Sequence, residues 1–507
     1  MKMDRRLFMG TALAGMASYG LPLAAQSGLP SLLEAARALA REAYVAPSGV
    51  LPAPFEGLDY DAYRGIRPIV GQAALLPQGD GFTLDLMPPG LYFPDPVTVE
   101  RQVDGVWSDF PLTPALFDFE PRYFDEIPET SPGAGFSGMR LRHPVNAPDR
   151  MDEVAVFQGA SYFRAIGRAM VYGLSARAVA LGTGGSVPEE FPRFTHMRVH
   201  EGQGDHIRME ALIDSPSLTG HFDLVLRPGV DTVMDVNVTL FPRARLETIG
   251  IAPLTSMYLK GPMRDAASDD FRPRVHDSDV LFVENGAGER LWRPIGNPVS
   301  VETSAFGDVD PTSFGLFQTA RTFEDFEDTE ARYEARPSAV VRPQSAWGPG
   351  AVLLVEIPTG TEFLDNIVAF WRPEAALEAG GEYRYDYRID WTLSAPDTQS
   401  PARILASRSG REHEFPGTRR FVIDFDGSAE GLMPDLSVSG DGSTPEMLRG
   451  LALFDLPDGR GQRATFLVTP GEETRALELR LVLRDAAGLA VSPVWLHRWT
   501  RKRDGRE

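Results

Sequence analysis

The fold class is decided by the stretch YRYDYRIDWTL, residues 383–393. Aromatic and aliphatic residues occupy every second position and alternate with arginine, aspartate and threonine. Because successive side chains of a strand point to opposite faces of a sheet, this alternation predicts a long antiparallel strand with one buried face. Residues 234–240 repeat the pattern, with methionine, valine and leucine alternating with polar residues. We therefore expect a mainly β protein.

Turn-forming residues support this interpretation. The 507-residue chain has 49 glycines and 42 prolines, scattered among short apolar runs. Such a distribution indicates many turns between many strands. The start of the chain differs, because Ser31-Leu32-Leu33-Glu34 is a capping box and apolar residues then recur at helical spacing up to Tyr44. One amphipathic helix is expected there.

The length predicts more than one domain, since a single core rarely serves so many residues. A polar, proline-containing segment without periodicity follows the decisive strand, and we place a linker at residues 396–401. The larger domain then spans residues 27–395. Residues 402–507 contain alternating leucines at 477–483 and turn signals, which predict a small sandwich of immunoglobulin type.

Residues 1–25 have the features of an export signal. Arg5-Arg6 precedes an apolar stretch over residues 7–23, and Ala24 and Ala25 follow it. Paired arginines before a hydrophobic pair are typical of the twin-arginine route, although a Sec signal would lead to the same compartment. No other stretch has the roughly 18 apolar residues that a membrane span needs. We expect a periplasmic, soluble protein.

Charge and composition restrict the function classes. The formal charge of −21 would repel phosphate backbones and anionic lipids, whereas a neutral polysaccharide meets no such repulsion. The absence of cysteine excludes disulfides and cysteine nucleophiles. Motifs of serine hydrolases, nucleotide-binding proteins and zinc proteases are missing. His196 and His200 have ligand-like spacing, but residues 194–199 are typical of a strand, so we expect no metal site there. From the missing motifs and the negative charge we also expect no cofactor and no nucleic-acid partner.

Two acidic clusters precede apolar strands. His276-Asp277-Ser278-Asp279 comes before residues 280–282, and Glu362-Phe363-Leu364-Asp365-Asn366 before residues 367–371. This spacing is common in turns whose side chains cap backbone amides. Glycoside cleavage, however, also requires two carboxyl groups, one protonated to donate to the leaving oxygen and one ionised to activate water.

Aromatic residues near these clusters allow two interpretations. Their rings can stack on sugar faces, or they can pack in the core. The candidates are Trp292, Tyr333, Trp347 and Trp371.

Longer runs in a fixed order point to one family. They are Asp59–Arg67, Phe157–Ala165, Tyr172–Arg177, Glu189–Pro192, Gly250–Met257, His276–Asp279, Arg336–Ser338 and Val355–Trp371. The chain resembles the periplasmic glucan biosynthesis proteins G and D (MdoG/OpgG/OpgD), strongly over residues 55–400 and weakly beyond. The twin-arginine signal leans towards the D type. The resemblance implies a large galactose-mutarotase-like β-sandwich followed by an immunoglobulin-like domain, and action on osmoregulated periplasmic glucan, a β-1,2-linked glucose polymer.

The resemblance also implies catalytic roles, because some members are similar to inverting endo-β-1,2-glucanases. The general acid then lies at Asp365, and the base lies at Asp277 and acts through a relay of hydroxyls and waters. Asp365 should have a raised pKa, with help from Glu362, while Asp277 should stay ionised. Further residues expected to bind substrate or shape the site are Glu362, Tyr333, Arg336, His276, Asp279 and Trp371.

The chain departs from the family pattern at four positions. Val340 and Arg342 stand where relatives usually carry a tryptophan and an acid, and Glu284 and Arg290 stand where tryptophans are frequent. Their replacement is expected to change sugar affinity at the cleft while leaving the acid pair intact.

Three functions stay open at this point. The first is a hydrolase that trims β-1,2-glucan. The second is a transglycosylase that uses the same acid, with a sugar hydroxyl replacing water. The third is a non-catalytic glucan-binding factor that contacts the membrane glucan-synthesis machinery. Product length, oligomeric state and linear or cyclic substrate are not specified by the sequence.

Overall fold

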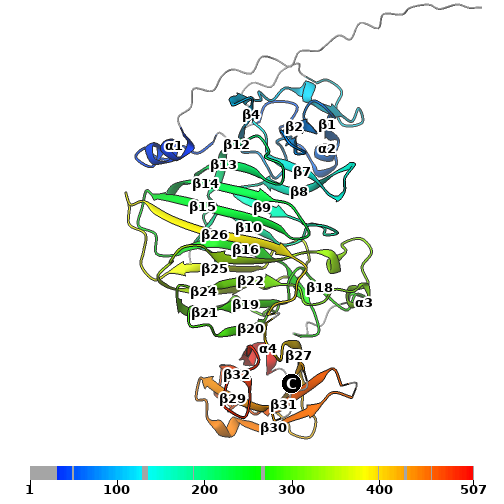
Figure 1. Cartoon of the computed structure of the whole chain (residues 1–507), viewed down its shortest axis with the longest axis vertical. Helices are drawn as coiled ribbons and strands as arrows, with labels where there is room; N and C mark the ends of the chain where they lie inside the picture. The colour runs from blue at the N-terminus through cyan, green and yellow to red at the C-terminus, as the bar shows by residue number, and fades with distance from the viewer. Residues whose placement is uncertain are drawn as a thin grey trace, which may run out of the picture.

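The protein is mainly β in a computed structural model that describes residues 31–47, 51–127, 135–185, 188–263, 269–397, 399–427, 431–457 and 459–505. The predicted export signal, residues 1–25, lies outside these ranges. Two large sheets form a sandwich, and a smaller group of strands lies at one end of it (Figure 1). Among the described residues, no helix has the length and apolar character needed to cross a bilayer.

The first large sheet carries part of the candidate site. In spatial order its strands are β2 (Leu76–Pro77), β3 (Thr83–Met87), β7 (Gly138–Ala147), β8 (Arg150–Gln158), β9 (Tyr162–Ala165), β10 (Ser175–Arg177), β16 (Ile249–Ser256), β25 (Ile367–Pro373), β24 (Pro349–Glu356) and β21 (Glu302–Val309), with β11 (Val179–Leu181) also paired to β16. Strands β9, β10, β16 and β25 are therefore consecutive neighbours.

The second large sheet contains the strand from which the fold was predicted. Its order is β29 (Met433–Gly440), β32 (Ala476–Arg484), β33 (Val494–Thr500), β20 (Arg290–Pro294), β19 (Val280–Glu284), β22 (Ser313–Phe317), β23 (Ser338–Pro343), β26 (Tyr383–Thr392), β15 (Thr232–Pro242), β14 (Leu218–Arg227), β13 (Ile207–Asp214), β12 (Arg193–Val199), β4 (Thr98–Val103) and β5 (Val106–Asp109). The two strands predicted by alternation pair with each other, with Val236 opposite Tyr387. The prediction of antiparallel β structure is confirmed.

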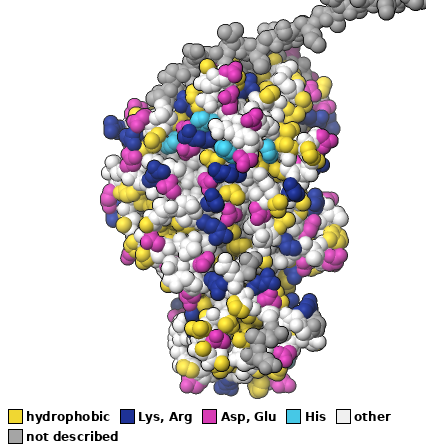
Figure 2. Space-filling view, in the orientation of Figure 1, with side chains coloured by type: hydrophobic (Ala, Val, Ile, Leu, Met, Phe, Trp, Pro, Cys, Tyr) yellow, Lys and Arg dark blue, Asp and Glu magenta, His cyan; other side chains and the backbone are white. Residues whose placement is uncertain are grey.

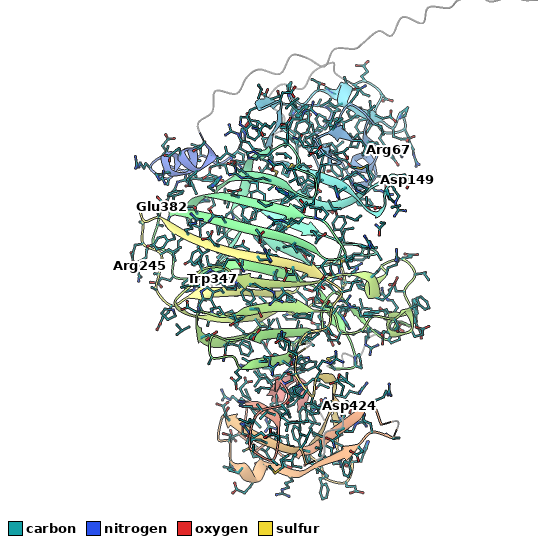
Figure 3. The ribbon with its side chains drawn as sticks, in the orientation of Figure 1. Arg67, Asp149, Arg245, Trp347, Glu382 and Asp424 are labelled. Atoms are coloured by element: carbon teal, nitrogen blue, oxygen red, sulfur yellow. The ribbon has the colours of Figure 1, made fainter. Side chains whose placement is uncertain are left out.

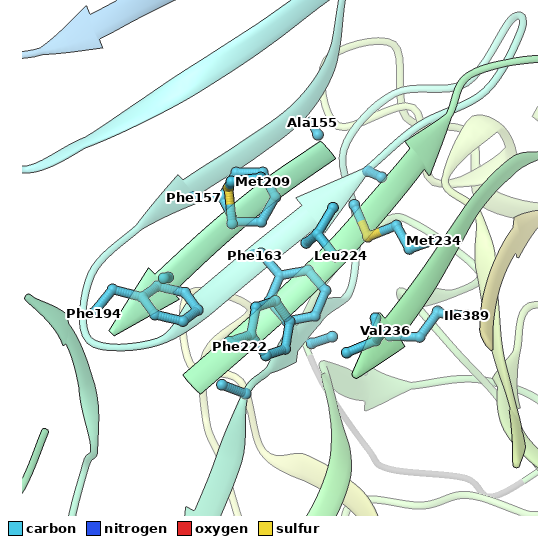
Figure 4. Packing of buried hydrophobic residues seen from close by; sticks show 14 of the residues in the cluster. Ala155, Phe157, Phe163, Phe194, Met209, Phe222, Leu224, Met234, Val236 and Ile389 are labelled. Carbon is cyan, nitrogen blue, oxygen red and sulfur yellow. The ribbon is translucent and has the colours of Figure 1, made fainter. Parts of the chain in front are cut away.

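The main core lies between the two sheets. The ring of Phe222 on β14 is 5.4 Å from that of Phe163 on β9 and 5.5 Å from that of Phe194 on β12, measured between centroids. Val236 and Ile389 extend this cluster (Figure 4). Close packing of side chains from both sheets fixes the strands against each other.

Strand β12 also confirms the strand prediction for residues 194–199. His196 Nε2 lies 2.6 Å from a carboxylate oxygen of Glu100, and His200 Nε2 lies 2.7 Å from one of Glu210. Histidines gather on the upper part of the face shown in Figure 2, among interspersed acidic and basic side chains. The two imidazoles thus bind separate carboxylates, and the pair formed by His196 and Glu100 is buried.

Helices are few and short. Helix α1 (Leu32–Leu39) begins after Ser31, whose hydroxyl accepts a hydrogen bond from the Glu34 amide, so the predicted cap is confirmed. The helix ends well before Tyr44. The remaining helices of the described ranges are α2 (Tyr60–Arg64), α3 (Phe323–Phe326), α4 (Arg501–Asp504) and the 3-10 turns η1 (Pro114–Leu116), η2 (Tyr333–Ala335) and η3 (Pro445–Met447). Two small ribbons pair β1 (Ile66–Pro68) with β6 (Phe117–Phe119) and β17 (Tyr258–Lys260) with β18 (Val275–His276).

The C-terminal strands continue the second large sheet rather than standing apart from it. A separate sheet contains β27 (Ile404–Arg411), β28 (Arg419–Asp426), β31 (Gly461–Val468) and β30 (Leu448–Asp455). Strand β33, in contrast, pairs in parallel with β20, with Trp292 opposite Trp495. Phe282, Trp292 and Phe317 belong to the same buried cluster as the C-terminal apolar residues. The domain division at residues 396–401, between β26 and β27, stays a prediction.

Candidate functional site

Four neighbouring elements of the first sheet bring the site together. Strand β9 carries Arg164, β10 carries Arg177, β16 carries Thr255, and Asp365 lies in the loop before β25. The Arg177 Nε donates to the Thr255 hydroxyl at 3.0 Å, and Arg164 Nη2 lies 3.7 Å from Asp365 Oδ2. The Asp365 side chain is 36% exposed, so its carboxyl group is accessible to a ligand.

The loop that carries Asp365 is fixed by the buried side chain of Asn366. Its oxygen accepts from the Tyr258 amide at 2.8 Å, and its nitrogen donates to the carbonyls of Tyr258 at 3.0 Å and Ile357 at 2.9 Å. Asn366 thereby acts as a clamp between β17 and the loop. The clamp holds Asp365 at the entry to β25.

The surroundings of Asp365 favour its protonated form. Desolvation raises the pKa of the Asp365 carboxyl, while the positive charges of Arg164, Arg177 and Arg336 oppose the increase. The direction agrees with what a proton donor requires. Glu362 does not supply the expected like charge, because it binds Arg272 and Tyr333 instead.

Asp277 is held in a different environment. It follows β18, and its amide donates to the Met257 carbonyl at 2.8 Å. Its side chain is 5% exposed, and Arg336 Nη1 donates to its Oδ1 at 2.5 Å. The pKa of Asp277 is raised overall, because burial and the negative charge of Asp365 outweigh the lowering by the Arg336 guanidinium. The ionised form expected for a base therefore depends on Arg336.

A chain of polar contacts positions Arg336. Its guanidinium carbon lies 4.2 Å from the centroid of the Tyr333 ring. The Tyr333 hydroxyl donates to Glu362, and Glu362 also accepts from Arg272 Nη1 at 2.9 Å. Burial and Glu362 both raise the pKa of Tyr333, so the hydroxyl keeps its proton. Tyr333 is 1% exposed, and the prediction that it lines the cleft directly is wrong. Tyr333 therefore positions Arg336 through its ring, and Glu362 positions Tyr333 through its hydroxyl.

His276 and Asp279 are also structural rather than substrate-binding, because both are buried. The His276 ring stacks on Tyr258 at 5.2 Å, and burial lowers its pKa to about 3, so it is neutral. Asp279 accepts from the Thr319 hydroxyl at 2.6 Å and from the Thr319 amide at 2.9 Å. Burial raises the pKa of Asp279 to about 6. The two side chains shape the turn that carries Asp277.

The expected aromatic stacking residues belong to the cores. Trp371 is fully buried and packs 6.1 Å from Trp347, which is labelled in Figure 3, and Trp292 is 1% exposed. The prediction of Trp371 as a sugar contact is wrong, since no face of its ring is accessible. Exposed rings near the site are those of Phe363, 91% exposed in the Asp365 loop, and Phe191, whose centroid lies 5.5 Å from the Arg177 guanidinium.

Arg164 and Arg177 are the functional residues that our sequence reasoning missed. Both lie in runs that carried the family resemblance, residues 157–165 and 172–177, so a signal was present. Their proximity to Asp365 could not be read from the sequence, because it arises from pairing of distant strands. In the described ranges, no group of three or more histidine and acidic side chains has the arrangement that holds a metal ion.

The four departures from the family pattern lie away from this site. Glu284, Arg290, Val340 and Arg342 line a separate pocket, to which neither Asp277 nor Asp365 contributes. The structure places them in a pocket that the acid pair does not line, and their effect on sugar affinity stays a prediction. They lie at the far end of β19, on its neighbour β20 and on β23, which is separated from β19 by β22.

Comparison with known proteins places the chain in a family. A family model described as "Periplasmic glucan biosynthesis protein, MdoG" matches residues 28–499. The chain belongs to the MdoG family. Members similar to it are named "Glucans biosynthesis protein G". They include a Vibrio cholerae protein, 41% identical over 479 residues (93% of this chain and 86% of the relative), and a Rhodopseudomonas palustris protein, 40% identical over 481 residues (93% of each).

A third MdoG-family relative, from Pseudomonas putida, is 37% identical over 509 residues, covering 97% of this chain and 87% of the relative. It too is named protein G. The lean towards the D type, taken from the twin-arginine motif, is therefore not supported by these relatives.

Proposed function

We propose that this MdoG-family protein acts in the periplasm on glucan, as an inverting endo-β-1,2-glucanase with Asp365 as general acid and Asp277 as general base. The supporting observation is the pairing of two carboxyl groups in contrasting environments. Asp365 is accessible and has a raised pKa, while Asp277 is buried and bound to Arg336. The proposal also includes export by the twin-arginine route.

In this mechanism Asp365 donates its proton to the glycosidic oxygen as the bond to the anomeric carbon breaks. Water attacks that carbon from the opposite face, so the new reducing end has inverted configuration. The water loses a proton, which passes to Asp277. Because Asp277 is almost inaccessible, the proton must travel through intervening hydroxyls or waters rather than by direct contact.

Arginine residues have two tasks in this scheme. Arg336 opposes the rise in the pKa of buried Asp277 and so favours the ionised form, which can accept the proton. Arg164 and Arg177 limit the rise in the pKa of Asp365, so that the carboxyl group can both hold and release a proton. Exposed Phe363 and Phe191 offer apolar faces on which sugar rings can stack.

The test is incubation of the protein with linear β-1,2-glucan, following reducing ends and product sizes. The Asp365→Asn variant keeps the shape but removes the donor, and should lower the rate at least a hundredfold. Asp149→Asn, in the exposed turn after β7, is the matched control and should retain full activity.

Other outcomes point to the alternative functions. Rearranged products without new reducing ends would indicate a transglycosylase that uses the same acid. Glucan left unchanged by the wild-type protein would contradict catalysis and favour a binding or assembly factor that contacts the glucan-synthesis machinery.

A further inference from the structure

A pocket lies on the outer face of the 14-stranded sheet, apart from the acid pair Asp277 and Asp365. Along β19, Leu281 and Val283 point into the main core, whereas Phe282 belongs to the second core and Glu284 lines the pocket. The cavity has a volume of about 420 Å³, within the range of small-molecule sites. None of the acid-pair residues lines it. The segment between β26 and β27, which includes Ala395, forms one wall.

Charged side chains in this pocket are held by ion pairs. Glu284 and Arg290 are directly opposite each other on β19 and β20. Arg342 Nε lies 2.8 Å from Asp390 Oδ2, and Arg290 Nη1 lies 3.0 Å from Asp397 Oδ1. Polar groups are thus presented from strands β19, β20, β23 and β26 and from the covering segment.

One of these groups has unused hydrogen-bonding capacity. The Asp397 side chain is 2% exposed, and its Oδ1 accepts from Arg290 and from the Ser400 amide. Its Oδ2 is buried and has no hydrogen-bond partner among the described residues. A buried acceptor without a donor is unfavourable, so a ligand hydroxyl that donates to Oδ2 would be bound favourably.

The lining indicates the chemical class of the ligand. Acidic side chains outnumber the two arginines, which disfavours a phosphate or another anion. Phe282, Phe317 and Val340 add apolar surface beside the polar groups. Fixed donors and acceptors next to apolar surface suit a neutral polyol whose hydroxyls and CH groups face different sides.

We propose that this pocket binds a glucose unit of a glucan chain, as a secondary saccharide site separate from the acid pair. The identity of the sugar rests on the proposed function, whereas the preference for a neutral polyol rests on the pocket. A glucan held here would be anchored beside the segment that joins the larger group of strands to the C-terminal group.

The test uses exposed residues of the wall, so that the fold is preserved. In an Asp365→Asn background, which prevents turnover, Ala395→Trp and Gln399→Trp each fill the mouth of the pocket from the covering segment. Ala486→Trp, on the exposed turn after β32, is the matched control. Each protein is titrated calorimetrically with a β-1,2-linked glucose tetrasaccharide, after circular dichroism has shown that it is folded.

The control should bind one more tetrasaccharide per chain than either wall variant. Equal stoichiometry in all three proteins would overturn the proposal. Titration with inorganic phosphate tests the ligand class, since phosphate binding that both wall variants lose would overturn the assignment to a neutral sugar.

The same experiment separates the two proposals. If the acid-pair site does not take the sugar, the control should bind one tetrasaccharide and the wall variants none. That result would contradict the proposed function while supporting the secondary site.

Discussion

Arg336 is the residue on which the charge of the proposed base depends. It donates to buried Asp277 and stacks on Tyr333, which in turn binds Glu362. A buried carboxylate without a cationic partner would be costly and would take up a proton instead. The proton-accepting ability of Asp277 is therefore set by a neighbour that comes from a different part of the chain.

Replacing this arginine should shift the pH dependence of activity. In Arg336→Gln the pKa of Asp277 rises further, so the base becomes protonated at higher pH and the acidic limb of the kcat/KM profile moves towards neutral pH. We expect about a tenfold loss of activity or more at neutral pH.

The measurement is hydrolysis of β-1,2-glucan across a pH series. Arg336→Lys keeps a positive charge, so its acidic limb should move less than that of Arg336→Gln. Arg384→Gln, on the solvent face of β26, should behave as wild type. An acidic limb that stays in place in Arg336→Gln would exclude Asp277 as the base.

At the scale of elements, the loop before β25 and the ribbon β17–β18 act together. Asn366 clamps the loop to Tyr258, and Tyr258 pairs with His276, the residue before Asp277. The two carboxyl groups are thus connected by a short path of backbone contacts. Their relative position is set by secondary structure rather than by side-chain flexibility.

Asn366→Ala should loosen this connection. The variant loses three hydrogen bonds in a buried place, which is expected to cost about 2–4 kcal/mol of stability and to lower kcat by about tenfold or more. Urea unfolding and glucan hydrolysis would measure the two effects. Asn237→Ala, which removes a hydrogen bond to Asp386 on the outer face, should lose stability only. Unchanged kcat in Asn366→Ala would contradict the clamp.

The alternation of apolar and polar residues predicted the strands well where one face is buried and the other is exposed to solvent. It identified β15 and β26, because Val236 and Tyr387 are buried while their neighbours are not. It failed for the aromatic contacts, since a buried tryptophan and a sugar-stacking tryptophan look the same in a sequence. Trp371 is an example, because its burial follows from the position of β25 beside β16 in the sheet, which the sequence does not give.

The site was predicted in part for a similar reason. Asp277 and Asp365 were found through local motifs, but Arg164 was not assigned a role, because its approach to Asp365 depends on strands far apart in sequence. Glu284 was placed at the cleft because it is close to Asp277 along the chain. The strand β19 separates them, and Glu284 at its far end lines a pocket to which Asp277 does not contribute.

At the scale of the whole molecule, the C-terminal group of strands shares a core and a sheet with the larger group. Trp292 is at the centre of this junction, 1% exposed and opposite Trp495. Trp292→Ala should lower the free energy of unfolding by about 3–5 kcal/mol. Because both groups of strands pack on this residue, unfolding should remain a single transition. Intrinsic fluorescence and circular dichroism, recorded in parallel, would measure it.

Leu451→Ala, at an exposed position of β30, is the control and should change stability by less than about 1 kcal/mol. Two separated transitions in wild type, with only one of them shifted in Trp292→Ala, would show that the groups of strands unfold independently.

The pairing of β33 with β20 also bears on how the chain folds while it is being synthesised. Strand β20 is complete at Pro294, but its partner follows only at Val494–Thr500, the last strand described. Until then, β20 presents unpaired backbone groups and buried-type aromatic residues, the features that promote edge-to-edge aggregation. A nascent chain therefore stays prone to aggregation at this edge while some 200 further residues are synthesised. Under the twin-arginine export proposed above, the protein could be exported only after the strand that closes this edge has been made.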